Sequence, residues 1–470
     1  CYVCTECGYA VTEPKEPSGM MADQEGAMEE YEEAKAIFDA AKASAGHTYV
    51  PTGETWAEDN STVTFSVLEC SAICPDRKPY LDCLREDDTI TITLAEEVTF
   101  EAEVETIGTC PEGLTKIYKV SGEVEVDGEM IPFTATKTEK LDPTKCTFVD
   151  GVCSVCGDCA VKRVYGESRD DTALEVADQL KATLGVEKFD SMIIAVGDND
   201  RFADALSGSY LATQKGAPIL IYCWNRLSAA TKEYIQNNLS ENGTIYILGD
   251  TPAVPLEVEE YLLGENYNVV RLAGEDRYLT NLAILEEAGV GDKEILVATG
   301  NSFPDSLSAA ATGLPIVLVN GLGSKLKAAQ KEFFEKLDGN KITILGSEDA
   351  VNTTIEKAIE EIVGTEVNRI AGTEREETSK LIAEEYYTEA DFALVAYSWN
   401  FPDGLCGGPL AYAMKAPLLV SRKNRETLTN GYITDKEIEA GYILGSTDVI
   451  ADEVARKIFG LSENAVINRK

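Results

Sequence analysis

Apolar runs of strand length alternate with segments of helical periodicity through the last two thirds of the chain. The clearest stretch begins with the short apolar run NVVRLAG and continues with a helical pattern over 278–288. Three more strand-like runs follow, EILVATG, PIVLVN and KITILG, each before a helical pattern, over 305–311, 324–337 and 350–363. Continuous apolar strands separated by helices are typical of a parallel sheet that is covered on both faces. The pattern therefore predicts a doubly wound α/β fold.

This order of elements occurs three times, with shared residues. Each copy opens with R-x-x-G-x-x-R and a threonine three residues later, starting at Arg163, Arg271 and Arg369. A second block reads FADALSG, FPDSLSA or FPDGLCG, and a proline-led apolar run and a Leu-Gly ending complete the copy. Self-similarity at a period of roughly 100 residues indicates duplicated domains, because solenoid repeats are about 20–50 residues long. We expect domains at 161–264, 265–364 and 365–470.

Residues 1–160 follow two other patterns. Apolar residues at helical spacing over 20–46 predict one helix. From about 48 to 145 the chain alternates polar residues with Val, Ile, Thr and Phe, which indicates antiparallel strands. Asp127-Gly128 is a residue pair favoured in two-residue hairpin turns. A cysteine-rich region with one helix and a small antiparallel β domain is therefore expected here.

Charge and histidine content exclude several classes of function. The chain of 470 residues carries 82 Asp and Glu against 41 Lys and Arg, a net charge of −41. A field of this sign opposes binding to nucleic acid and to anionic lipid. No apolar run approaches the roughly 20 residues of a membrane helix, so no transmembrane segment is predicted. The one histidine, His47, makes Ser-His-Asp, Cys-His and most zinc hydrolase chemistry improbable.

Eleven of the 13 cysteines lie within residues 1–159. Two clusters, CYVCTECG and GVCSVCGDC, each contain C-x-x-C-G, a tight turn in which two thiolates can face one metal ion. Two such turns supply the four sulfurs that suit zinc or iron. The predicted ligands are Cys4, Cys7, Cys153 and Cys156. Disulfides are the alternative, since a secreted chain favours them, and Cys1 and Cys159 lie outside the four and can pair with each other.

These two turns resemble the metal-binding turns of rubredoxins. The resemblance covers about a dozen residues at each end of the region, YVCTECGYAVTEP and VDGVCSVCGDC. It implies one iron ion, or zinc in its place, held by the four predicted cysteines. Rubredoxins have a short loop where this chain has a long insertion, so the resemblance bears on the metal site more than on electron transfer.

In each repeat an arginine and an aspartate occupy loops between a strand and a helix. The second arginine of each motif is Arg169, Arg277 or Arg375, and the shared aspartate is Asp204, Asp305 or Asp403. Ligands of open α/β sheets bind beyond the carboxyl ends of the strands, which makes these six residues candidates for ligand binding. The structural alternatives are helix capping by the aspartate and an Arg–Asp bridge within each copy.

Taken together, these motifs resemble the cell wall-binding repeats of the second type, found in clostridial and related surface proteins. The resemblance covers about residues 163–460 and rests on R-x-x-G-x-x-R, F-x-D-x-L, the proline-led strand and I-L-G. It implies three repeats around a pseudo-threefold axis that attach noncovalently to an anionic cell-wall polysaccharide and display the preceding region. The protein is then a non-catalytic, extracellular protein of the cell wall, and the six residues are its candidate polymer-binding residues.

Two further functions and one further cofactor remain open. The chain is alternatively a surface-anchored, rubredoxin-like electron carrier, or a self-assembling surface-layer component with other surface proteins as partners. An acidic module that holds an anionic polymer must overcome electrostatic repulsion. Its arginines, or a divalent cation that bridges polymer and repeats, are the candidate means.

Overall fold

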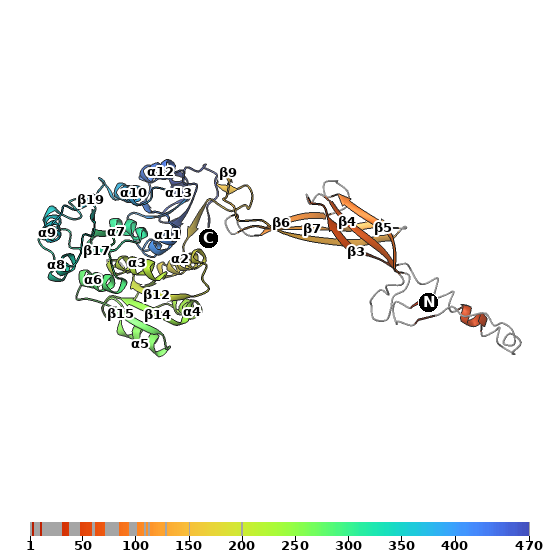
Figure 1. Cartoon of the computed structure of the whole chain (residues 1–470), viewed down its shortest axis with the longest axis horizontal. Coiled ribbons are helices and arrows are strands. Elements are labelled where there is room, and N and C mark those ends of the chain that lie inside the picture. The colour runs from red at the N-terminus through yellow and green to blue at the C-terminus, as the bar shows by residue number, and fades with distance from the viewer. Residues whose placement is uncertain are drawn as a thin grey trace. The chain divides into compact units, whose positions relative to one another are not determined.

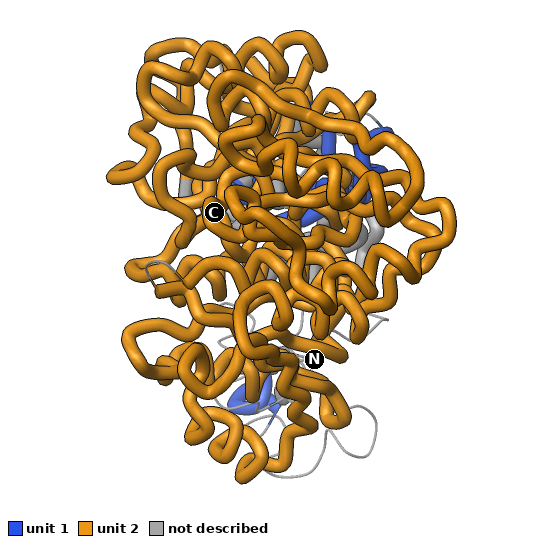
Figure 2. Tube along the Cα trace, turned by 90° about the vertical axis from the view of Figure 1, so that its left-hand side faces the viewer, with its two compact units in different colours: residues 1–146 blue, residues 147–470 orange. Residues whose placement is uncertain are grey.

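The computed structural model describes most of the chain and divides it into two compact units, residues 1–146 and 147–470. Figure 1 shows the elements along the chain, and Figure 2 colours the two units. The described residues are 2–3, 10–11, 31–36, 48–58, 62–70, 84–93, 101–107, 110, 113–126, 129–149, 151–198 and 201–469.

The first unit is built from antiparallel strands. One three-stranded sheet has the order β3-β4-β5 and another has the order β6-β7-β8, while two short strands pair as β1-β2. Their bounds are β1 (Tyr2–Val3), β2 (Ala10–Val11), β3 (Thr48–Trp56), β4 (Thr62–Cys70), β5 (Leu84–Thr93), β6 (Glu101–Ile107), β7 (Thr115–Val126) and β8 (Glu129–Lys140). The small antiparallel β domain is thereby confirmed.

Two finer predictions for this unit are tested only in part. Val126 of β7 pairs with Glu129 of β8, as a hairpin with a two-residue turn requires. The turn residues Asp127 and Gly128 themselves lie outside the described residues. Of the predicted helix over 20–46, the described residues 31–36 are helical.

The second unit holds three parallel sheets of one design (Figure 1). Their orders are β13-β12-β14-β15, β17-β16-β18-β19 and β21-β20-β22-β11-β23, so the first four positions correspond in every sheet. The strands are β11 (Val161–Val164), β12 (Phe189–Val196), β13 (Ile219–Tyr222), β14 (Leu239–Leu248), β15 (Asn268–Leu272), β16 (Ile295–Thr299), β17 (Ile316–Val319), β18 (Ile342–Leu345), β19 (Asn368–Ile370), β20 (Phe392–Tyr397), β21 (Leu418–Ser421), β22 (Ala440–Leu444) and β23 (Asn468–Arg469). A short antiparallel pair, β9 (Phe148–Val149) and β10 (Val152–Cys153), precedes them.

Helices connect the strands of each sheet. They are α2 (Arg169–Leu184), α3 (Ala203–Lys215), α4 (Ala229–Asn238), α5 (Leu256–Gly264), α6 (Arg277–Ala288), α7 (Pro304–Ala309), α8 (Ala328–Glu335), α9 (Thr353–Val363), α10 (Arg375–Tyr386), α11 (Gly407–Ala413), α12 (Glu426–Asp435) and α13 (Asp452–Ile458), with a 3-10 turn η4 (Ala310–Thr312) after α7. Strands β13, β17, β18 and β21 are buried along their whole length, because helices cover both faces of each sheet. The α/β fold predicted from the apolar runs is confirmed.

The sheets are offset from the sequence repeats. Strand β15 carries the first arginine of the second repeat yet completes the first sheet beside β14, and β19 completes the second sheet beside β18. The third sheet is completed by β11, which comes first in the unit and pairs in parallel with β22, about 280 residues later in the chain. Each copy of the motif thus joins one sheet to the next, and the third join closes the ring. Among the described residues, no helix combines the length and the apolar character needed to cross a membrane.

Candidate functional site

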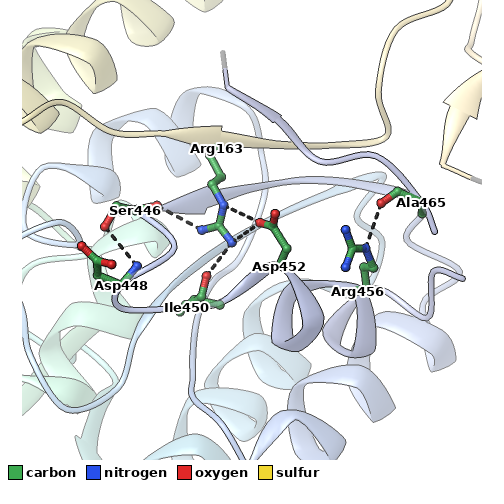
Figure 3. Close-up of polar contacts among 8 residues, drawn as sticks. Arg163, Ser446, Asp448, Ile450, Asp452, Arg456 and Ala465 are labelled. Carbon is green, nitrogen blue, oxygen red and sulfur yellow. Dashed lines mark hydrogen bonds and ion pairs between the residues drawn. The ribbon is translucent and has the colours of Figure 1, made fainter. Parts of the chain in front are cut away.

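The first arginine of each motif binds the Leu-Gly ending of the sheet that its own strand completes. Arg163 on β11 donates hydrogen bonds to the carbonyl oxygens of Gly445 (3.2 Å) and Ile450 (2.5 Å). Its Nη2 also pairs with Asp452 Oδ1 at 2.7 Å, as Figure 3 shows. Arg271 binds Gly249 O and Glu259 in the same way, and Arg369 binds Gly346 O and Glu356. These arginines therefore hold the strand order and have few donors left for a ligand.

The glycine and threonine of the motif form the turn that starts the next helix. The Gly274 N–H donates to Thr280 Oγ1 at 3.0 Å, and Gly166 and Gly372 donate in the same way to Thr172 and Thr378. A Cβ at Gly274 would lie 2.5 Å from the backbone carbon of Leu279, so only glycine fits there. These glycines are therefore turn residues of the motif.

The second arginine begins a helix and reaches the carboxyl end of the next strand. Arg277, at the start of α6, donates from Nη1 to Gly300 O (2.6 Å), directly after β16. Arg169 donates to Gly197 O at the start of the loop after β12, and Arg375 donates to Ser398 O after β20. All three side chains are half-buried. They lie at the strand ends where ligands of parallel sheets bind.

The shared aspartates lie near the second arginine of the following repeat. Burial raises the pKa of Asp204 to about 6, and the charge of Arg277 opposes that rise. Burial raises the pKa of Asp305 to about 6 as well, against the charge of Arg375. For Asp403 burial again raises the pKa, while a hydrogen bond with Thr172 and the charge of Arg169 oppose it. The aspartate and arginine positions therefore couple cyclically from each repeat to the next.

Two structural roles expected for these aspartates are wrong. Among the residues that the structure describes, no ion pair joins a motif arginine to the shared aspartate of its own copy, and the motif arginine that acts on each carboxylate comes from the neighbouring copy. The charge of Arg201, which lies outside the motif, also lowers the pKa of Asp204. Helices α3 and α7 begin without a side-chain cap, and Asp204 Oδ1 is buried without a hydrogen-bond partner. Each carboxylate instead packs against the glycine that ends the Leu-Gly run. A Cβ at Gly346, whose φ is +91°, would lie 2.5 Å from Asp305 Oδ2.

Three phenylalanines from the shared F-x-D block meet where the repeats join. The ring centroids of Phe202, Phe303 and Phe401 are 5.3–6.0 Å apart in every pairing. The Arg277 guanidinium lies 5.7 Å from the centroid of Phe202, and that of Arg375 lies 5.9 Å from Phe303. The sequence signal for this cluster is the phenylalanine that recurs at the start of the F-x-D block in all three copies, and the cluster was not predicted from it. The mutual contacts agree with a pseudo-threefold arrangement of the repeats.

Four cysteines form the second candidate site. The Sγ atoms of Cys110, Cys146, Cys153 and Cys156 all lie within 4.8 Å of one another. Tetrahedral zinc with Zn–S bonds of about 2.3 Å places its sulfurs about 3.8 Å apart, so the cluster fits a four-thiolate metal site. Cys153 and Cys156 belong to the predicted set. The predicted ligands Cys4 and Cys7 lie outside the described residues, and their role stays a prediction.

Backbone turns present these sulfurs. The Gly157 N–H donates to Cys153 O at 2.9 Å, and Gly113 N–H donates to Cys110 O at 3.3 Å, with positive φ at both glycines. Burial alone would raise the pKa of Cys153, but hydrogen bonds from Cys156 and Val155 outweigh it and lower the pKa to about 6. Cys110 and Cys146 carry no C-x-x-C signal, because they lie 36 residues apart in the chain.

Comparison with known proteins agrees with this geometry. The family model for cell wall binding domain 2 matches residues 163–259, 271–356 and 369–455. The N-acetylmuramoyl-L-alanine amidase LytC of Bacillus subtilis is 26% identical over 308 residues, which cover 64% of this chain and 58% of that protein. The amidase enhancer of the same organism is 29% identical over 332 residues, which cover 68% of this chain and 44% of that protein. The chain thus spans about half the length of the curated relatives that it matches.

Two solved structures share the fold. Cwp6 from Clostridium difficile superposes with a TM-score of 0.59 at 20% identity, covering 89% of this chain and 64% of that one. Cwp8 from the same organism gives 0.57 at 21% identity, covering 91% and 84%. Both likenesses concern the fold.

Proposed function

Because the chain belongs to the cell wall binding domain 2 family through three tandem repeats, we propose that residues 161–470 anchor it to an anionic cell-wall polymer through Arg169, Arg277 and Arg375. The protein is one of the cell wall or cell surface. The finer part of the proposal is that the guanidinium groups of these three arginines contact the charged groups of the polymer.

The arginine set carries this proposal. The second arginine of each motif donates a hydrogen bond from Nη1 to one backbone carbonyl and is half-buried. The first arginines instead form ion pairs with carboxylates. Arginine can bind phosphate or carboxylate through two parallel hydrogen bonds, and this geometry gives short-range attraction in a chain of net charge −41. Asp204, Asp305 and Asp403 are proposed to set the positions of the arginines, and direct contact of the aspartates with the polymer stays a prediction.

Co-sedimentation of the full chain with purified cell walls of the source organism tests the proposal. Arg277→Ala should weaken binding about tenfold, since a charge-assisted hydrogen bond contributes about 1.5–3 kcal/mol. Arg456→Ala is the matched control, because Arg456 is also half-buried and donates to one carbonyl, Ala465 O. Salt at 0.5 M should leave binding of the native chain largely intact, as short-range pairs are screened less than the long-range repulsion. Equal binding by Arg277→Ala and the native chain would make the arginines structural.

A divalent cation is a second means of holding an anionic polymer on an acidic surface. If such a cation bridges polymer and protein, chelation by EDTA should lower wall binding, and added magnesium or calcium should restore it. If chelation leaves binding unchanged, the arginines act without a bridging cation.

We propose that the chain binds without catalysis. Ser-His-Asp and Cys-His hydrolysis both need an imidazole base, and the one histidine of the chain, His47, lies outside the described residues. The names of the two relatives concern amidase activity and its enhancement, and the chain spans only about half of each. Incubation with cell walls should release no soluble fragments.

We further propose one iron or zinc ion in the four-cysteine cluster. The support is the mutual approach of the four sulfur atoms, a donor set that suits both metals. A four-thiolate iron site is coloured, so visible absorbance would support the alternative of a surface electron carrier. Zinc is colourless and has no redox chemistry, so a zinc ion would make the site structural. Self-assembly into a surface layer, with other surface proteins as partners, remains the other alternative, and sedimentation of the purified chain alone decides it.

A further inference from the structure

The first repeat displays a tryptophan beside its second arginine. Trp224 lies in the turn after β13 and is 50% exposed. The guanidinium carbons of Arg169 and Arg226 lie 5.5 and 6.0 Å from the centroid of its ring. Both Trp224 and Asn225 have positive φ, 51° and 56°, and Asp198 Oδ1 accepts a hydrogen bond from the Trp224 N–H. This left-handed turn is costly for tryptophan, and it holds the indole outward.

The third repeat assembles the same groups from different loops. Trp399 follows β20 rather than the next strand and is 60% exposed. The guanidinium carbons of Arg375 and Arg422 lie 5.4 and 5.0 Å from its ring centroid. Arg422 is also paired with Glu376 at 2.9 Å, whereas the ion pairs found among the described residues include none of Arg375. One combination, an exposed indole with two guanidinium groups, is therefore built twice from positions that do not correspond in the repeat.

The second repeat has a smaller version of this arrangement. Tyr278 directly follows Arg277, and the Lys327 Nζ lies 5.9 Å from the centroid of its ring. The Tyr278 hydroxyl donates to Asn301 Oδ1 at 3.1 Å, and Lys327 pairs with Asp276 at 2.5 Å. The Tyr278 ring is more buried than the two indoles, and the charge of Lys327 is neutralised by Asp276. We therefore assign the main aromatic contacts with the polymer to the two tryptophans.

We propose that Trp224 and Trp399 are stacking subsites for sugar rings of an anionic glycan whose charged groups bind Arg169 and Arg375. This proposal rests on the proposed function, since it names the chemistry of the same polymer. The apolar C–H face of a pyranose ring packs on an aromatic ring, and guanidinium groups bind phosphate or carboxylate on the adjoining unit. Single exposed apolar side chains such as Leu263 are ordinary at a protein surface, but an exposed indole flanked by two guanidinium groups combines a stacking face with anion-binding donors, and ligand contact accounts for that combination.

A nucleic acid would also use aromatic stacking and arginine. The net charge of −41 argues against it, because a nucleic-acid site needs a continuous basic channel for the phosphate backbone. Each subsite here holds two arginines within an acidic surface, which suits a polymer with fewer charges per unit length. Competition by single-stranded DNA is therefore one of the outcomes to be measured.

The test uses the full chain, purified cell walls of the source organism and the polysaccharide released from them. Trp224→Ala and Trp399→Ala should each weaken wall binding about fivefold, and the double variant about 25-fold, as for stacking sites that act independently. Leu263→Ala, at an exposed apolar position on α5, is the control. Thermal melting verifies that all variants are folded. In the double variant Trp56 is the last of three tryptophans, so its fluorescence should no longer respond to the polysaccharide.

Treated walls identify the charged group. Hydrofluoric acid removes phosphodiester-linked polymer, whereas carbodiimide with an amine neutralises carboxylates, and loss of binding after one treatment names the anion. Loss after neither treatment would overturn the anionic part of the proposal. Native-like binding by the double variant, or displacement of the wall polymer by single-stranded DNA, would overturn the sugar-stacking subsites and leave the anchor function standing. Absence of binding by the native chain would instead remove the proposed function itself.

Discussion

Asp305 and Arg375 show at the residue scale how one repeat depends on the next. The carboxylate is held between the glycine of its own Leu-Gly run and the charge of an arginine from the following copy. Its burial disfavours the ionised form, so the residue is a cost to stability at neutral pH. Asp204 and Asp403 repeat the arrangement. The three aspartates therefore do not stabilise the fold at neutral pH, and we propose that they position the arginines of the neighbouring repeats.

The pH dependence of stability should reveal this cost. The pKa of Asp305 rises from its ordinary value of 3.8 to about 6 on folding, so the folded state binds more protons between these values. Stability therefore falls as pH increases from about 4 to 6 and stays lower above 6, by on the order of 2–3 kcal/mol for this residue. Asp305→Asn should remove that fall, with a melting temperature closer to the native one at pH 4 than at pH 8. Calorimetry from pH 4 to pH 8 measures it.

Asp349→Asn is the control for this measurement, because Asp349 is an exposed aspartate of the same repeat. It removes the same charge without removing a buried carboxylate. If Asp305→Asn and Asp349→Asn change the pH profile alike, the burial of Asp305 has no influence on stability.

At this scale the sequence predicted which residues matter better than what they contact. Arg277 and Asp305 were identified because they recur at strand-to-helix loops. Their partners were assigned within one copy, since a repeat read by itself offers no other candidates. The partner of Asp305, Arg375, lies in the next copy, and only packing of the copies brings the two together.

At the scale of elements, β11 is the strand on which closure of the three sheets depends. It begins the repeat region, yet it pairs with β22 near the end of the chain and also contacts β23. Arg163 anchors it by two carbonyl hydrogen bonds and the Asp452 ion pair (Figure 3). The corresponding strands β15 and β19 follow β14 and β18 as the next strands in the chain, so they carry no such closing role.

Arg163→Met should therefore loosen β11 more than it loosens the rest of the unit. We expect a loss of about 3 kcal/mol in the free energy of unfolding, since the carbonyl oxygens of Gly445 and Ile450 and the Asp452 carboxylate lose their hydrogen-bond donor. Amide hydrogen exchange over residues 161–164 should become faster, while exchange in β12 and β16 stays slow. Urea unfolding and exchange measured by mass spectrometry give the two quantities.

Arg369→Met is the matched variant, because Arg369 makes the same contacts to Gly346 O, Val351 O and Glu356. It should cost similar stability without exposing one end of the repeat region. Protection of residues 161–164 in Arg163→Met equal to that in the native chain would contradict the closing role of β11.

At the scale of the whole molecule, the metal site draws its ligands from separated parts of the sequence. The predicted set and the structural cluster share Cys153 and Cys156 and differ in the other two cysteines. Cys110→Ser and Cys156→Ser should each lower metal affinity more than about tenfold, as the loss of a direct ligand exceeds the effect of a neighbouring group. Elemental analysis of the purified chain gives the metal and its amount, and visible absorbance separates coloured iron from colourless zinc.

Cys4→Ser distinguishes the two ligand sets. Retained metal in Cys4→Ser would assign the site to the structural cluster, whereas loss in Cys4→Ser and retention in Cys110→Ser would favour the predicted set. Cys223→Ser is the control, because Cys223 is buried directly after β13 in the first repeat. Full metal retention in all of these variants would remove the proposed site.

The sequence by itself determined the local features of this protein. Periodicity set the strands and helices, threefold self-similarity set the number of repeats, and the recurring arginines and aspartates marked the strand ends, because these are properties of short stretches of chain. Tertiary structure alone decided three others: β11 joins the third sheet, each aspartate faces the next repeat's arginine, and Cys110 and Cys146 lie beside Cys153 and Cys156. Each of these three features brings together residues that lie far apart in the chain, and such contacts depend on how the helices and strands pack against one another.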